Sequence, residues 1–208
     1  MRKIILTLMV LSAGLSAIAQ NTYGPDDSNT SATRKQKAMS AWHQDMAEFR
    51  ARSEHDRQMN ALADSLAYVQ GRAALVNRDF VLEANSVTFK NGATAFVNST
   101  TNFISVKGNR AVVQISPSNY ASGPNGVGGV TVDGTVSDFQ ITTDKKGRTT
   151  MSMNVMGIGI NAQVEVYMYP GTNSATATVY PNFNSNTVWL QGDIVPYENS
   201  DVFEGSSL

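Results

Sequence analysis

From residue 79 onward, apolar and polar side chains alternate with a period of two, and this pattern constrains the fold more than any other feature. A period of two places every second side chain on the same face of a β-strand. Each run therefore predicts an antiparallel strand with one buried face. Turn sequences such as Lys90-Asn91-Gly92 and Pro170-Gly171-Thr172-Asn173 separate the runs. The clearest runs are 87–89, 111–115, 130–132, 151–155, 164–168, 175–179 and 188–190.

One run changes its phase. Val132 and Val136 are apolar at even positions, whereas Phe139 and Ile141 are apolar at odd ones. A one-residue slip reverses the facing of a strand, so we predict a β-bulge within residues 134–138. Bulged strands bend, which favours a strongly curved sheet. We therefore expect a mainly β fold with an N-terminal helix. The sheet is a partly closed antiparallel barrel or a sandwich of about seven or eight strands packed by an amphipathic helix.

The region before the strands favours helix, because residues 34–78 contain no proline and one glycine. Apolar residues recur there every three or four positions, in two runs separated by a polar stretch at 50–56. Residues 34–56 form a helical extension, and residues 57–208 form a helix followed by the β-domain. Because the second run is longer and leads directly into the first strand, we expect its stripe to be the packed one. The runs are Met39, Trp42, Met46 and Phe49, then Met59, Leu62, Leu66, Val69, Ala73 and Val76.

The first twenty residues have the pattern of an export signal. Arg2 and Lys3 precede an apolar run, and Ala17-Ile18-Ala19 supplies a small-x-small cleavage site, so we expect cleavage near Ala19-Gln20. The polar residues 21–33 then form a flexible leader. The apolar run is shorter than the roughly 20 residues that span a bilayer, and no later run is longer. The expected location is the periplasm or the exterior.

Cysteine and charge exclude several classes of function. The chain has no cysteine, which excludes a lipid-modified N-terminal cysteine, disulfides and thiol catalysis. Removing Arg2 and Lys3 from 16 basic residues leaves 14 against 17 acidic ones, so the mature net charge is about −3. Nucleic-acid binding, which needs a concentrated basic surface, is not expected. With two histidines and no catalytic motif, we expect no enzyme activity, metal site or cofactor.

Four aromatic residues form the most suggestive cluster. Tyr167, Tyr169, Tyr180 and Trp189 fall on the polar face of what we predict to be successive strands. Exposed aromatic rings combine apolar area with a polar tip, so they suit sugar rings or a peptide. The alternative is that the helix at residues 39–49, or another subunit, covers this face. Exposure of the four rings distinguishes the two interpretations.

Carboxylates on the predicted strands permit a hydrolase as a third possibility. A glycoside hydrolase needs two carboxylates that face each other across a cleft. Glu165 and Asp193 both point away from the apolar face by their position in the alternation, so solvated positions explain them as well. The candidates are Glu83, Asp133, Asp138, Glu165 and Asp193.

Several segments resemble a family of exported Bacteroidetes proteins known as domain of unknown function 4251. They are FVLEANSVTF (80–89), NSTTNFISVKGNRAVVQI (98–115), GPNGVGGVTVDGTVSDFQITTDKKG (123–147) and ATATVYPNFNSNTVWLQGDIVP (175–196). The resemblance extends from about Arg57 to the C-terminus. It implies an exported domain with a helix and a β-region, and it implies no catalytic residue.

Three functions remain open at this stage. The first is a non-catalytic, lipocalin-like module for a small apolar or glycan-like ligand, with a cavity lined by Val, Met and Phe or an aromatic outer face. The second is an envelope interaction or inhibitor module that docks a protein partner through the helix at residues 39–49. The third, and least favoured, is the carboxylate-dependent hydrolase.

Overall fold

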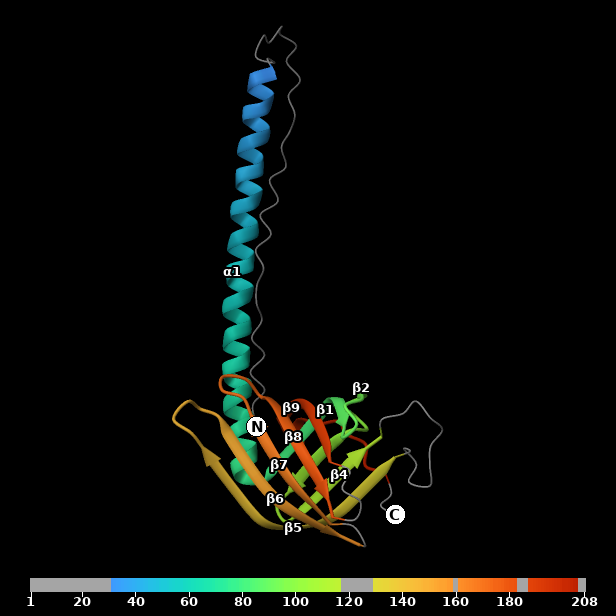
Figure 1. Cartoon of the computed structure of the whole chain (residues 1–208). Helices are drawn as coiled ribbons and strands as arrows, with labels where there is room; N and C mark the ends of the chain where they lie inside the picture. Colours follow the sequence, from blue (N-terminus) through green and yellow to red (C-terminus); the bar gives the residue numbers. More distant parts are fainter. Residues whose placement is uncertain (1–30, 117–128, 159–160, 183–186, 206–208) are drawn as a thin grey trace. The chain divides into compact units, whose positions relative to one another are not determined.

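The protein folds as one long helix followed by a closed antiparallel barrel with one extra strand (Figure 1). The structure, a computed structural model, describes residues 31–116, 129–158, 161–182 and 187–205. The predicted signal peptide and nearly all of the leader lie outside these ranges. The described residues divide into two compact units at Arg52/Ser53, and the helix α1 (Ser31–Asn77) crosses this boundary.

Each strand pairs with its neighbour in the chain, and the first pairs with the last. The strands are β1 (Asp79–Phe89), β2 (Thr94–Phe96), β3 (Phe103–Lys107), β4 (Arg110–Ile115), β5 (Val130–Thr143), β6 (Thr149–Gly157), β7 (Asn161–Met168), β8 (Ser174–Pro181) and β9 (Val188–Pro196). Pairing runs from β1 through β3 to β9 in order, and β1 pairs with β9. Eight of the described strands thus close the barrel, while β2 pairs with β1 alone. The predicted fold class is confirmed, in its closed-barrel form.

Two β-bulges bend the barrel. In β5 the register shifts between Ser137 and Gln140, and Asp138 adopts φ 52°. The bulge predicted from the change of apolar phase is therefore confirmed. A second bulge, between Ala84 and Ser86 of β1, lies on the seam with β9. Bulges bend strands and increase their twist, which allows a sheet to close on itself.

The barrel interior is an apolar core. Its side chains form one contiguous cluster that also includes Ala74 and Leu75 of α1. Among the described inward-facing strand positions the polar side chains are Thr143 and Thr149, whose hydroxyls bond each other at 3.0 Å. The fully buried members with the largest side chains are Phe80, Leu82, Ile104, Met151, Met153, Met168, Leu190 and Ile194.

The last turns of α1 pack against the barrel end formed by the β5–β6 and β7–β8 turns. The Tyr68 hydroxyl donates to the Gly147 carbonyl at 2.6 Å, and Leu75 is fully buried. Gly71 lets the helix approach closely, since a Cβ there would lie 3.1 Å from the Ile194 carbonyl oxygen. The helix ends at Asn77, and the next residue, Arg78, adopts φ 54° and places its guanidinium 4.4 Å from the centre of the Phe139 ring.

The face of α1 that packs is not the predicted one. The stripe that we expected to be buried is exposed: Met59, Leu62, Leu66, Val69 and Val76 are each 53–66% exposed. At 3.6 residues per turn, these residues lie on roughly the opposite side of the helix from Tyr68, Gly71 and Leu75. The expectation was wrong because the contact with the barrel end is made by the Tyr68 hydroxyl, Gly71 and Leu75, and not by a row of large apolar side chains. Apolar periodicity alone does not identify such a contact.

Candidate functional site

The four predicted aromatic residues lie on the outer side of β7, β8 and β9, or directly after β7. Their exposed fractions are 39% for Tyr167, 46% for Tyr169, 41% for Tyr180 and 37% for Trp189. Alternation along each strand explains this, because the residues next to them in the chain point into the apolar core. We call Tyr167, Tyr180 and Trp189, together with their immediate neighbours on this side of the sheet, the aromatic face.

Strand register arranges the aromatic face around Thr178. Thr178 pairs with Trp189 on one side and with Glu165 on the other. Tyr180 lies two residues farther along β8 and pairs with Gln163, while Tyr167 pairs with Thr176. Neighbouring strands are about 4.8 Å apart and second neighbours along a strand about 6.8 Å apart, so Trp189 and Tyr180 are diagonal neighbours about 8 Å apart.

Longer side chains cover the centre of this face. Thr178 is only 6% exposed although its side chain points outward, whereas Trp189 and Tyr180 beside it are each more than a third exposed. The exposed surface of the face therefore comes from the aromatic rings, with Glu165 opposite Thr178 on β7.

Three of the four aromatic residues have polar tips that find no partner among the described residues. Within the described part of the chain, the indole N–H of Trp189 and the hydroxyls of Tyr167 and Tyr180 make no hydrogen bond. The Tyr169 hydroxyl, in contrast, bonds the Thr176 hydroxyl at 3.1 Å. Tyr169 is therefore held against the sheet, and the other three present a ring and a free donor to solvent.

Each of the predicted carboxylates accepts hydrogen bonds from neighbouring side chains. Asp133 accepts two from Arg110, Asp138 accepts one each from Asn154 and Ser137, and Glu165 accepts one from Gln163. Glu83 and Asp193 are opposite each other on β1 and β9, but each accepts a hydrogen bond from a serine hydroxyl. No group of three potential metal ligands occurs among the residues that the structure describes.

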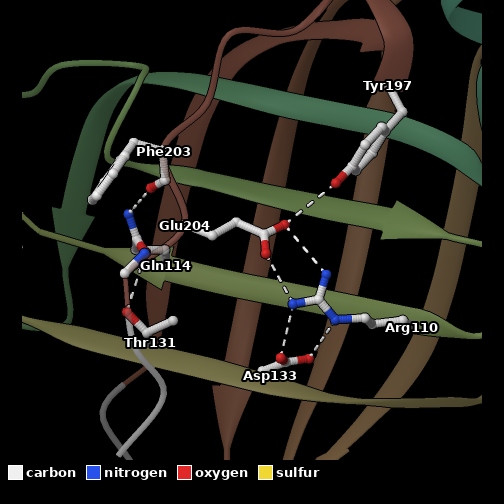
Figure 2. A network of polar contacts seen from close by, with 8 residues as sticks. Arg110, Gln114, Thr131, Asp133, Tyr197, Phe203 and Glu204 are labelled. Atoms are coloured by element: carbon white, nitrogen blue, oxygen red, sulfur yellow. Dashed lines mark hydrogen bonds and ion pairs between the residues drawn. The ribbon is translucent and has the colours of Figure 1, made fainter.

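A polar network that was not predicted from the sequence lies on the outside of β4 (Figure 2). Residues 197–205, which we call the C-terminal strap, cross the outside of β3 and β4. The guanidinium of Arg110 donates to Asp133 at 2.8–2.9 Å and to Glu204 of the strap at 2.8 Å. These hydrogen bonds, first to Asp133 and then to Glu204, raise the pKa of Arg110. The amide of Gln114 bonds the strap backbone at Phe203 and Gly205.

The strap covers a small second core. Val81, Phe103 and Val112 are buried on the outside of β1, β3 and β4, against Val195, Tyr197 and Val202. Val112 indicates in the sequence that the outer side of β4 is covered, because β4 is apolar at three consecutive positions instead of alternating. Since Arg110 is already bound to two carboxylates, we interpret the network as a structural clamp.

The fold and the surface together define the structural class of the protein. It is a closed antiparallel barrel with a helix packed at one end and an exposed aromatic face on the outside. The chain belongs to the DUF4251 family (Domain of unknown function), whose model matches residues 63–194. A crystal structure of a DUF4251 family protein from Bacteroides eggerthii DSM 20697 shares 50% sequence identity with it. The match covers 69% of this chain and 96% of that chain, with a TM-score of 0.61. The comparison with curated proteins gave no match.

These comparisons confirm the resemblance that the sequence suggested. The C-terminal strap and the first part of α1 lie outside the matched range of residues 63–194. Among the described residues, the structure contains no helix whose length and apolar content would let it cross a membrane.

Proposed function

We propose that the protein is an exported, non-catalytic binding module that holds a glycan on its aromatic face. The carrying observation is that Tyr167, Tyr180 and Trp189 expose their rings on one outer face of the sheet, with polar tips that have no hydrogen-bond partner among the described residues. Sugar rings offer apolar C–H faces and a rim of hydroxyls. Aromatic rings cover the first, while the indole N–H of Trp189 and the hydroxyls of Tyr167 and Tyr180 pair with the second.

The barrel interior supports this choice over a lipocalin-like cavity. A cavity for a small ligand normally carries a few polar groups that orient it. Among the described inward-facing strand side chains, the polar groups are two threonine hydroxyls that bond each other, so few polar groups are left to orient a ligand. The outer face instead supplies both apolar surface and free hydrogen-bonding groups.

Glu165 should make the proposed site prefer ligands without negative charge. It is the charged side chain nearest to Thr178, since the two are directly opposite on β7 and β8. A carboxylate beside a bound ligand repels negative charge at short range. We expect neutral glycans and amino sugars to bind more tightly than glycans that carry carboxylate or sulfate groups. Glu165→Gln should reduce that difference.

The two tryptophans permit a direct test, because Trp42 and Trp189 are the two in the chain. In a Trp42→Phe variant, the fluorescence comes from the proposed site. Titration with chitin, cellulose and peptidoglycan oligosaccharides should change its intensity or wavelength in a saturable way. Fatty acids serve as probes of the interior.

Affinity in two matched variants completes the test. Trp189→Ala should weaken glycan binding at least tenfold, which corresponds to about 1.4 kcal/mol. Trp42→Ala, an equally large change at a residue that is 58% exposed on α1, should leave it unchanged. Glycan binding that survives Trp189→Ala, or binding of fatty acids alone, would refute the proposed site.

Export is a separate part of the proposal. The N-terminal sequence of residues 1–20 supports it, with cleavage near Ala19-Gln20. The protein should be recovered from the periplasm or the medium of an expressing bacterium. Its measured mass should equal that of a chain that begins at residue 20 or 21. Recovery of the uncleaved chain from the cytoplasm would contradict this location, and it would leave the binding test unaffected.

A further inference from the structure

The exposed stripe on α1 is a row of apolar side chains that the barrel unit leaves uncovered. Its members are Met59, Leu62, Leu66, Val69, Ala73 and Val76, and five of them are more than half exposed. They belong to Ser53–Leu208, the same compact unit as the barrel. Soluble proteins scatter single apolar residues over their surface, whereas a continuous apolar row marks an interaction site.

We propose that this stripe docks a second copy of the chain, helix against helix. The spacing of the six residues is three, four, three, four and three, which is the spacing of the a and d positions of a coiled coil. In a coiled coil, such a row of residues packs against another helix with the same spacing, and we call this contact the helix seam. The chain itself supplies such a helix, and two identical stripes form a self-complementary interface of the kind found in twofold dimers.

The residues beside the stripe favour a second copy as the occupant. Flanking positions of a coiled coil face each other across the seam, and like charges there repel. Here they are nearly uncharged: Gln58, Ala63, Ser65, Gln70, Arg72 and Asn77. In a parallel seam in register, Arg72 faces Asn77 of the second copy, so two copies approach without repulsion. A partner recognised by charge would have little to bind.

The position of the barrel leaves the stripe accessible. The barrel contacts α1 through Tyr68, Gly71 and Leu75, on roughly the opposite side of the helix. A second helix therefore docks without displacing a contact that holds α1 to the barrel. Covering six apolar side chains on each copy removes on the order of 1,000 Å² from water, at the lower bound of specific interfaces. We expect a dissociation constant of about micromolar.

Sedimentation equilibrium of residues 21–208 measures this directly. The wild-type chain should convert from monomer to dimer over the micromolar range. The double variant Leu62→Glu/Leu66→Glu places two charges in the seam and should stay monomeric at concentrations at least a hundredfold higher. Both residues are exposed, by 66% and 58%, so the monomer should keep its circular dichroism spectrum and melting temperature.

Two further variants separate the stripe from general surface effects. Phe96→Glu changes an apolar residue that is 91% exposed on β2, and it should dimerise like the wild type. Ala73→Leu fills the smallest layer of the seam and should lower the dissociation constant about fivefold to tenfold. A chain that remains monomeric up to about 1 mM, or a dimer that the double variant leaves intact, would overturn the proposal.

Discussion

Gly192 of β9 is the position where one added methyl group should harm the fold most. It lies on the seam that closes the barrel, opposite Ala84 and next to the β1 bulge. A Cβ on Gly192 would lie 1.9 Å from the carbonyl oxygen of Glu83 and 2.8 Å from the Cα of Ala84. Both are backbone atoms, so no side chain can rotate away. The Gly192→Ala variant must separate β1 from β9.

The size of the effect follows from this geometry. A carbon and a carbonyl oxygen approach to about 3.3 Å at closest, so β1 must move by more than about 1 Å. That displacement breaks two or three ladder hydrogen bonds, worth about 1 kcal/mol each. Overpacking of the adjacent core adds about 1–3 kcal/mol. The total of about 3–6 kcal/mol is a large part of the roughly 5–15 kcal/mol that stabilises a typical domain.

Urea and thermal unfolding, followed by circular dichroism, measure the loss. At about 2–4 °C per kcal/mol for a protein of this size, the melting temperature should fall by roughly 6–24 °C. Gly171→Ala is the control, because Gly171 has φ 77° and open space around it. It should cost about 1 kcal/mol from backbone conformation alone. A Gly192→Ala protein no less stable than Gly171→Ala would show that β1 and β9 are not so close.

Three smaller predictions concern the strap and the α1 contact. Glu204→Gln should cost about 1 kcal/mol in urea unfolding, because Arg110 is half exposed and keeps Asp133. Desolvation, then the charge of Glu204, raises the pKa of Tyr197, so its contribution to stability is complete below about pH 10 and is lost as the pH rises through the raised pKa. The free energy of unfolding of Tyr197→Phe, measured between pH 9 and about 11, should not show this loss. If the variant and the wild type lose the same free energy over that range, the prediction is wrong. Tyr68→Phe should cost about 1 kcal/mol by leaving the Gly147 carbonyl without its donor, and thermal unfolding measures this.

The sequence predicted the barrel well because its alternation is nearly uninterrupted. Inward positions of β6 and β7 are buried at every second residue, as the pattern required. The β5 bulge was also predictable, since a one-residue slip moves each following side chain to the other face. The bulge in β1 has the same signal in the sequence, because Phe80 and Leu82 are apolar at even positions and Val87 and Phe89 at odd ones. The prediction from the sequence used only the second pair, so it did not include this bulge.

The packing of α1 and of the C-terminal strap could not be predicted from apolar periodicity. For α1, the stripe with the strongest apolar signal is exposed, and the packed side uses Gly71 for close approach. For the strap, Glu204 reaches Arg110 across 94 residues of sequence. No local pattern encodes a pair that distant. The aromatic face was found because its residues are defined by strand alternation, which is local.

The two proposals together predict bivalent binding. A dimer formed through the α1 stripe would carry two aromatic faces, and a glycan polymer repeats the unit that each face would hold. Linked sites raise the apparent affinity for a repeating ligand without a new contact, often by about a hundredfold or more. The Leu62→Glu/Leu66→Glu variant should therefore bind an oligosaccharide as the wild type does, while it is released from an insoluble glycan polymer at lower competitor concentration. Equal retention of the two proteins on the polymer would show that the two surfaces act independently.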